Sequence, residues 1–202
     1  MAISSGKLIV FEGIDGSGKT TQLKRAAHWL TQAGYRVAAL LEPTYGPFGR
    51  KLRASAVSGR LPPEEERDLF VQDRRWNVEN NIKPALAAGK IVLLDRYYFS
   101  SIAYQGARGL DLDDVRARSE AVAPKPDLVL LFDLEPETAL NRIVKHRSET
   151  LNLFEGLEYQ RQVRNLFLSL QDPFIVRIDA ALDTEAVWND VQAEIGKLTF
   201  TL

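Results

Sequence analysis

The sequence feature that most constrains the fold is a glycine-rich segment near the start, Gly13-Ile14-Asp15-Gly16-Ser17-Gly18-Lys19-Thr20. It fits the phosphate-loop pattern of Gly, four variable residues, Gly-Lys and Ser or Thr. An apolar run at 8–11 precedes it and is typical of a buried strand, while Gly34 is placed to end the helix that follows. The apolar residues at helical spacing in that helix are Leu23, Ala26, Ala27 and Leu30. The segment therefore has the strand, loop and helix order that phosphate binding requires.

Phosphate binding follows from the residue types in this segment. Glycine has no Cβ, so the backbone can turn successive N–H groups inward, and these groups bind an anion together with a helix N-terminus. In this pattern Lys19 reaches the β- and γ-phosphates of a nucleotide, and the Thr20 hydroxyl ligates Mg²⁺. The expected phosphate-binding residues are Gly13, Ile14, Asp15, Gly16, Ser17, Gly18, Lys19, Thr20 and Thr21. The alternative is a glycine turn before an ordinary helix, and the motif alone does not separate a kinase from a GTPase or a motor ATPase.

The composition is ordinary for a globular protein, and a length of 202 residues favours a single domain spanning 1–202. A net charge of −1 gives no overall basic field, so we expect neither nucleic acid nor a membrane as a partner. The chain has no cysteine, which excludes disulfides and thiolate metal sites. No apolar run approaches membrane length, and we expect a cytoplasmic enzyme without a secretory signal. The consecutive glutamates at 64–66 are expected to be only a solvent-exposed helix start.

Apolar runs alternate with helical segments along the chain, at 8–11, 37–41, 91–94, 128–132 and 174–178. This alternation predicts an α/β fold, with a five-stranded parallel sheet flanked by helices on both faces. Active sites in such sheets lie beyond the carboxyl ends of the strands. After the first run comes the phosphate loop, and after the others come Glu42-Pro43-Thr44, Asp95-Arg96-Tyr97, Asp133-Leu134-Glu135 and Asp179. We expect these polar residues to form one site.

Asp95 and Arg96 follow the third of these runs and form a second candidate group. A carboxylate at the end of a strand beside the phosphate loop can hold Mg²⁺ through water, or it can orient a substrate group. The alternative is a structural salt bridge at the end of the strand.

Three segments of the chain resemble the signature sequences of the thymidylate kinases. They are Phe11-Glu12-Gly13-Ile14-Asp15-Gly16-Ser17-Gly18-Lys19-Thr20-Thr21-Gln22, then Phe70-Val71-Gln72-Asp73-Arg74 with Ile82-Lys83-Pro84-Ala85-Leu86, and Asp95-Arg96-Tyr97-Tyr98-Phe99-Ser100-Ser101-Ile102-Ala103-Tyr104-Gln105-Gly106. Their order and spacing match, and the resemblance covers nearly the whole chain. It implies a P-loop NTPase fold with a mobile lid at about residues 142–155. It also implies phosphorylation of dTMP to dTDP with ATP and Mg²⁺, small nucleotides as partners, and a homodimer.

The resemblance also implies how the acceptor nucleotide binds. Phe70 matches a Phe that stacks on the thymine ring, Arg74 an Arg that contacts base and phosphate, and Arg96 the Arg that binds the acceptor phosphate. The alternatives are a core position for Phe70 and a position on the helix surface for Arg74. The further substrate residues are Asp15 near the sugar and metal, Glu42 and Arg53 after the second strand, Ser101 at the base, Tyr104 at the sugar, and Gln105.

One loop departs from the family pattern. Many bacterial members carry Arg-Glu-Pro-Gly-Gly-Thr after the second strand, whereas this chain carries Leu41-Glu42-Pro43-Thr44-Tyr45-Gly46. The loop borders the acceptor pocket, and Tyr45 and Phe48 are placed to reshape it. The acceptor therefore stays open between dTMP, another deoxynucleotide and a nucleoside.

Transfer between two phosphates concentrates negative charge, so positioning and cations carry most of the catalysis. Some family members place a catalytic Arg inside the phosphate loop, but Ser17 occupies that position here, so the lid is the expected source. The lid candidates are Arg142 and Arg147, with a solvated helix charge as the alternative for each. The expected catalytic set is Lys19, Asp95, Arg96, Arg142 and Arg147, and the expected Mg²⁺ ligands are Thr20 and Asp95, directly or through water.

Two other classes of nucleotide-binding protein compete with a kinase. A GTPase switch typically carries an Asn-Lys-x-Asp guanine reader, which this sequence lacks. A catalytically weak nucleotide-binding protein fits the altered loop after the second strand, but the intact Lys19, Asp95 and Arg96 argue against it. The sequence therefore favours a kinase, in which a monophosphate oxygen attacks the γ-phosphorus of ATP in line.

Overall fold

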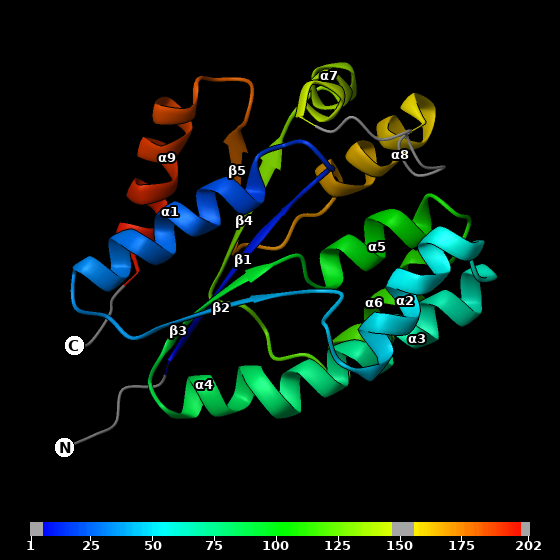
Figure 1. Ribbon diagram of the computed structural model, residues 1–202, viewed down its shortest axis with the longest axis horizontal. Coiled ribbons are helices and arrows are strands. Elements are labelled where there is room, and N and C mark those ends of the chain that lie inside the picture. The colour runs from blue at the N-terminus through cyan, green and yellow to red at the C-terminus, as the bar shows by residue number, and fades with distance from the viewer. Residues whose placement is uncertain (1–5, 147–155, 199–202) are drawn as a thin grey trace.

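The computed structural model of this protein describes residues 6–146 and 156–198. Its centre is a sheet whose described strands lie in the order β2-β3-β1-β4-β5 (Figure 1). The strands are β1 Lys7–Gly13, β2 Val37–Leu41, β3 Ile91–Asp95, β4 Leu128–Asp133 and β5 Ile175–Asp179. Every neighbouring pair is parallel. The expected α/β fold with a five-stranded parallel sheet is therefore confirmed, and each strand overlaps the apolar run that predicts it.

Helices cover both faces of the sheet, as Figure 1 shows. On one face α1 packs against α9 and the strands, and on the other α4 packs against β3 and α5 against β1. In the described part of the chain the helices are α1 Lys19–Gln32, α2 Pro47–Ser58, α3 Pro63–Asn77, the π-helical η1 Val78–Ile82, α4 Lys83–Ala87, α5 Tyr98–Gly106, α6 Leu112–Glu120, α7 Pro136–His146, α8 Leu157–Leu168 and α9 Thr184–Gly196. None of these described helices is long and apolar enough to cross a membrane.

The three central strands carry the core. Residues of β1, β3 and β4 with no exposed surface include Ile9, Val10, Phe11, Val92, Leu93, Leu94 and Leu130. Each buried side chain of this size stabilises the fold by about 1.5–3 kcal/mol relative to an exposed one. The edge strands β2 and β5 are only partly buried. The central strands are apolar on both faces because helices exclude water from both sides.

The strand order places the phosphate loop beside the end of β3. Strands β2 and β3 lie on one side of β1, and β4 and β5 lie on the other. Phe11 of β1 is in register with Asp95 of β3 and with Leu130 of β4. Open α/β sheets bind ligands at such a reversal of strand order, outside the carboxyl ends of the strands.

Burial corrects the expectation for the three glutamates at the start of α3. Glu64 and Glu65 are exposed, as expected, but Glu66 is only 4% exposed. It forms ion pairs with Arg60 at 3.0 Å and with Arg108 at 2.7 Å. A buried carboxylate needs such partners. The run of three glutamates in the sequence does not reveal which of them is buried or which arginines pair with it.

Candidate functional site

The loop between β1 and α1 has the curled backbone that its glycines predict. Gly13 and Gly16 have φ values of 140° and 81°, which residues with a Cβ rarely adopt. A Cβ on Gly13 would lie 2.5 Å from the carbonyl oxygen of Phe132, and one on Gly16 would lie 2.5 Å from that of Ala139. Gly18 is the N-cap of α1 and provides no side-chain hydrogen bond. The first N–H groups of α1 are thereby left to an anion.

Lys19 is 5% exposed and lies inside this loop. Its Nζ donates to the carbonyl oxygen of Ile14 at 2.8 Å and to Ser17 Oγ at 3.5 Å. Burial, and to a lesser extent the charge of Arg96, lowers the pKa of Lys19 to about 8. Neutral oxygens are weaker partners for an ammonium group than phosphate oxygens. The position of Lys19 is therefore compatible with phosphate binding.

Thr20 and Asp95 meet where α1 begins and β3 ends. Thr20 Oγ1 donates to Asp95 Oδ2 at 2.5 Å, so among the described residues the partner of this carboxylate is a hydroxyl rather than an arginine. A hydroxyl and a carboxylate are oxygen ligands of the kind that Mg²⁺ prefers. The described ranges hold no cluster of three or more His, Cys, Asp or Glu residues that suits a metal. Phosphate oxygens and water would therefore have to complete the coordination of Mg²⁺ here.

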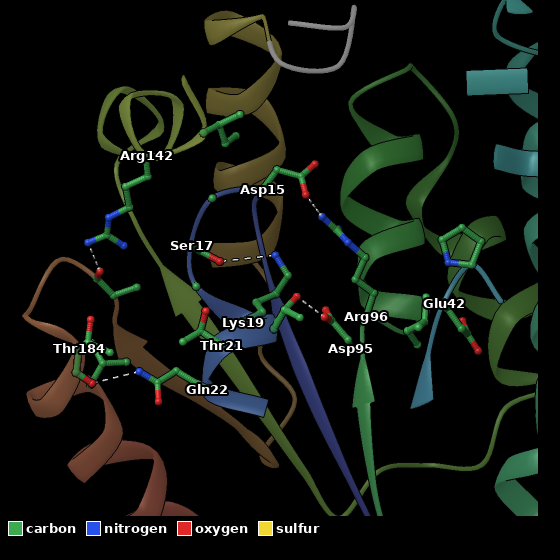
Figure 2. Close-up of a pocket in the computed structure, with 18 of the residues that line it drawn as sticks. Asp15, Ser17, Lys19, Thr21, Gln22, Glu42, Asp95, Arg96, Arg142 and Thr184 are labelled. Atoms are coloured by element: carbon green, nitrogen blue, oxygen red, sulfur yellow. Dashed lines mark hydrogen bonds and ion pairs between the residues drawn. The ribbon is translucent and has the colours of Figure 1, made fainter. Parts of the chain in front are cut away.

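Arg96 joins the phosphate loop to α5, and Figure 2 shows its contact with Asp15 of that loop. Its Nη2 donates to Asp15 Oδ1 at 2.5 Å and to the Tyr104 hydroxyl at 3.3 Å, and its Nη1 donates to Ser100 Oγ at 3.1 Å. Burial opposes its charge, but Asp15 and Tyr104 hold the pKa of Arg96 well above its usual range. Its φ is 68°, a left-handed conformation that costs a non-glycine residue roughly 1–2 kcal/mol. Backbone strain of this kind is characteristic of functional positions.

Two cavities open at this edge of the sheet. The larger, of about 1040 Å³, is lined by the phosphate loop, Asp95 and residues at 180–184. The smaller, of about 270 Å³, is lined by residues of α2, α3 and α5. The residues that line both cavities are Asp15, Glu42, Pro43, Arg53 and Arg96. Because Arg53 and Arg96 line both cavities, the two cavities suit two ligands whose anionic ends lie next to each other.

The smaller cavity contains the residues expected at the acceptor base. Phe70 is half-buried and lines this cavity outside the core cluster, so a core position for it is wrong. Ser101, Tyr104 and Gln105 line it from α5. Gln105 is 1% exposed, and neither its side-chain oxygen nor its nitrogen has a hydrogen-bond partner in the described part of the chain. A buried polar group without a partner costs about 1–3 kcal/mol, which a ligand carrying a donor and an acceptor would recover.

Arg74 is 1% exposed, so a position on the helix surface is wrong. Its Nε donates to Glu42 Oε2 at 2.9 Å, and its Nη1 and Nη2 donate to Ser119 Oγ at 3.1 Å and Ser101 Oγ at 3.0 Å. Asn77 donates to the other oxygen of Glu42 at 3.1 Å. Burial raises the pKa of the Glu42 carboxyl, and the Arg74 charge opposes that increase. Glu42 therefore holds Arg74 at the wall of the smaller cavity.

The loop after β2 is held by a side-chain pair. The Thr44 N–H donates to Asp73 Oδ2 at 2.7 Å and its hydroxyl donates to Oδ1 at 2.6 Å. Tyr45 is exposed, and the Cζ of Arg53 lies 4.6 Å from its ring centre, a cation–π contact. Arg53 Nε is buried and has no hydrogen-bond partner among the described residues. Phe48 is not among the residues that line either cavity, which corrects the expectation that it reshapes the pocket.

Arg142 lines the larger cavity from α7, and its Nη2 donates to the Ala180 carbonyl oxygen at 3.0 Å. Figure 2 shows it across the cavity from Arg96. This hydrogen bond uses Nη2 alone, so the other N–H donors of the guanidinium can still bind a phosphate. The other lid candidate, Arg147, lies outside the described residues, as does the rest of the expected lid from 147 to 155.

Glu12 and Ser100 also lie at this edge of the sheet and are absent from the residues predicted above. Glu12 has no exposed surface, and its Oε2 accepts the Ser100 hydroxyl at 2.6 Å. Ser100 lines the smaller cavity. A sequence signal for Glu12 did exist, because an acidic residue within an apolar strand is rare unless it has buried partners.

Comparison with known proteins identifies a matching family and several similar sequences. The family model described as thymidylate kinase matches residues 11–191. The chain is 47% identical over 188 residues to a probable thymidylate kinase of Archaeoglobus fulgidus, covering 93% of this chain and 94% of that protein. It is 48% identical over 190 residues to a thymidylate kinase of Xanthomonas campestris pv. campestris, covering 94% and 83%. It is 43% identical over 199 residues to a thymidylate kinase of Desulfotalea psychrophila, covering 98% of both.

Proposed function

The chain belongs to the thymidylate kinase family, and we propose that it transfers the γ-phosphoryl group of ATP to dTMP, giving ADP and dTDP. An oxygen of the dTMP phosphate forms a bond to the γ-phosphorus as the bond from that phosphorus to the ADP oxygen breaks. Such a transfer needs little acid–base chemistry from the protein, because both groups are phosphates. The protein has to bring the two nucleotides together and offset their charge.

The observation that carries this proposal is the junction of the two cavities. The phosphate loop lines the larger cavity and Phe70 lines the smaller. Asp15, Arg53 and Arg96 line both. ATP in the larger cavity and dTMP in the smaller would meet at these side chains, phosphate to phosphate. Alignment of the reacting groups supplies a large part of the rate enhancement in phosphoryl transfer.

Charge at the transferring group would be offset by Lys19 and the loop N–H groups from one side and by Arg96 and Arg53 from the other. Thr20 and Asp95 would hold Mg²⁺, which would neutralise part of the negative charge of the donor phosphates. Arg142 and Arg147 remain the candidate lid cations, with the lid at about residues 142–155 of a single domain.

The smaller cavity favours an acceptor with a flat base and a phosphate. Phe70 provides a stacking face. The Gln105 amide, which has no hydrogen-bond partner among the described residues, and the Ser101 hydroxyl provide polar groups for the base edge. Tyr104 would pack against the sugar. Two arginines at the junction favour a nucleotide over a nucleoside as acceptor, since a phosphate can form charge-assisted hydrogen bonds with them. We propose dTMP over other bases because of the family membership.

An assay of ADP formation with ATP, Mg²⁺ and each of dTMP, dUMP, dCMP, dGMP and thymidine tests the proposal. We expect the highest kcat/KM with dTMP and no turnover of thymidine. Rapid turnover of a different nucleotide without turnover of dTMP would show that dTMP is not the acceptor. Absence of turnover with every acceptor would contradict the proposed kinase activity.

Assembly and location are further proposals from the family resemblance. We propose a homodimer that acts in the cytoplasm on small nucleotides. Sedimentation of the full chain should give about twice the monomer mass of 22.7 kDa. A monomer at assay concentration that retains full turnover would contradict the dimer.

A further inference from the structure

Glu12 is a buried carboxylate one residue before the phosphate loop. It has no exposed surface, yet it forms no ion pair with the described Lys and Arg residues. The charge of Arg96 acts on it without a direct contact. Its three hydrogen bonds all come from the start of α5. Oε1 accepts the backbone N–H groups of Tyr97 at 2.7 Å and Ser100 at 3.0 Å, and Oε2 accepts the Ser100 hydroxyl at 2.6 Å.

The two backbone hydrogen bonds are explained by the needs of a helix end. Tyr97 is the N-cap of α5, and its own side chain does not cap the helix. A carboxylate that accepts N–H groups of the first turn replaces the missing cap and stabilises the helix N-terminus. One oxygen of Glu12 is sufficient for this purpose. The hydrogen bond to the other oxygen needs a different explanation.

The Ser100 hydroxyl has a single hydrogen, and it is directed to Glu12 Oε2. Its lone pairs are therefore turned away from Glu12, and one of them accepts Nη1 of Arg96 at 3.1 Å. The three groups form a directed chain, in which Arg96 donates to Ser100 and Ser100 donates to Glu12. Such a chain fixes the plane of the guanidinium group more firmly than a hydroxyl that is free to rotate.

The other side of Arg96 is held less permanently. Its Nη2 pairs with Asp15, whose side chain is 44% exposed. An incoming phosphate would compete with Asp15 for Nη2 of this guanidinium, whereas Ser100 holds the other terminal nitrogen, Nη1. Glu12 also holds the backbone N–H of Tyr97, directly after the left-handed residue Arg96. It thus acts on both the backbone and the side chain of this arginine.

We infer that Glu12, acting through the Ser100 hydroxyl, is a positioning residue that orients Arg96 toward the phosphate of the acceptor nucleotide. This inference deepens the proposed function and rests on it. Glu12 touches no substrate itself, and its effect is confined to ligands that carry the phosphate. The chain of hydrogen bonds predicts that the advantage of a nucleotide over its nucleoside depends on Ser100 and Glu12.

Two variants test the chain of hydrogen bonds at different links. Ser100→Ala removes the hydroxyl but leaves both backbone hydrogen bonds to Glu12. Glu12→Gln keeps one carbonyl oxygen for the backbone groups but replaces the charged acceptor of the Ser100 hydroxyl with an NH₂ donor. Ser55→Ala is the matched control, since Ser55 is a buried helical serine in α2 that lines neither cavity and donates to the Leu52 carbonyl oxygen at 2.8 Å.

The measurement is the dissociation constant of dTMP and of thymidine for each full-length variant by calorimetry, with the KM for ATP and the melting temperature. We expect Ser100→Ala and Glu12→Gln to weaken dTMP about tenfold, the loss of one charge-assisted hydrogen bond, with thymidine and the KM for ATP changed less than about twofold. Ser55→Ala should match the wild type. An unchanged preference for dTMP over thymidine in folded Ser100→Ala would overturn the inference, and so would equal weakening of both ligands.

Failure of the inference is distinguishable from failure of the proposed function. The wild type is assayed first, and absence of dTMP turnover concerns the acceptor assignment alone. In that case the same binding pair is measured with the nucleotide that the wild type does phosphorylate and with its nucleoside. Turnover of dTMP by the wild type combined with normal dTMP binding by both variants would remove the positioning role and leave the kinase assignment intact.

Discussion

Nη2 of Arg96 lies 2.5 Å from Oδ1 of Asp15, so the proposed ligand of the acceptor phosphate is paired with a carboxylate of the phosphate loop. The Asp15 side chain is 44% exposed and that of Arg96 only 19%. An incoming phosphate therefore meets the negative charge of Asp15 beside the cation that it has to bind. The acceptor site carries a built-in competitor for its own ligand.

Replacement of Asp15 by Asn removes that competitor and keeps the side-chain shape. We expect dTMP to bind Asp15→Asn about threefold to tenfold more tightly when ATP is absent, since like charges disfavour each other at close range. Calorimetry of dTMP binding checks this. Asp190→Asn, an exposed change on α9 with the same effect on net charge, is the control. Weaker binding to Asp15→Asn would show that Asp15 contributes to acceptor binding more than it opposes it.

Lys19 is placed to bind the transferring phosphate, so Lys19→Ala should act mainly on the rate. We expect kcat to fall by about 10²–10³, comparable to the loss of one preorganised donor at a reacting oxygen. The melting temperature should not decrease, because the variant removes a buried amine whose bonds are only to loop oxygens. Turnover close to that of the wild type would refute the role of Lys19.

The lowered pKa of Lys19, about 8, predicts a pH dependence of ATP binding. The amine has to be protonated to pair with phosphate, so the affinity for ATP should fall as pH rises above about 8, approaching tenfold per pH unit. In the free protein, burial favours the neutral amine of Lys19. Its contribution to stability is therefore complete above the unfolded pKa of 10.5 and is lost as pH falls through about 8. Calorimetry without acceptor between about pH 7.5 and 9.5 measures the binding effect. Lys19→Ala should bind ATP with a smaller slope, and a flat wild-type profile would contradict the prediction.

Phe70 lines the acceptor cavity, so Phe70→Ala should weaken the acceptor and little else. Loss of a stacked base costs about 1–3 kcal/mol, which corresponds to a rise in the KM for dTMP of about 5-fold to 150-fold. The KM for ATP should stay within about twofold of the wild type on the same stacking argument. Phe48→Ala is the matched control, a half-buried aromatic outside the residues that line the two cavities. Equal effects of the two substitutions on the KM for dTMP would place Phe70 in a structural role.

Local patterns were sufficient to predict the sheet and the phosphate loop. A strand buried on both faces is apolar throughout, and the glycines of the loop are needed for its backbone geometry, so both leave a signature in consecutive residues. The resemblance of three segments then grouped Phe70, Ser101 and Tyr104, which the structure brings to one cavity. Their roles in binding stay predictions.

Long-range pairing could not be predicted in the same way. Arg74 and Glu66 lie on a polar helix, and a helical pattern alone cannot reveal that partners from other elements bury them. Ser100 is one of two adjacent serines, and only the position of β1 beside α5 shows which of the two donates to Glu12. Polar groups in cores are satisfied by tertiary contacts, which leave no periodic trace in the sequence.

The buried pair of Glu42 and Arg74 provides a test of stability rather than of rate. Their side chains are 3% and 1% exposed and lie 2.9 Å apart. Glu42→Gln leaves the Arg74 guanidinium buried without its counter-charge, so we expect the free energy of unfolding to fall by about 3–5 kcal/mol. For a chain of this length the melting temperature should fall by about 10 °C.

The double variant Glu42→Gln with Arg74→Met separates the lost charge from lost packing. It removes the unpaired cation and replaces it with an apolar side chain, so it should be more stable than Glu42→Gln alone, since an unpaired buried charge costs more than a neutral replacement of both partners. Glu137→Gln is the control, because Glu137 and Arg161 form an ion pair on the surface, where such pairs contribute little. Calorimetric melting of the three variants decides the matter. A double variant less stable than Glu42→Gln would mean that the hydrogen bonds of Arg74 to Ser101 and Ser119 stabilise the fold more than its unpaired charge destabilises it.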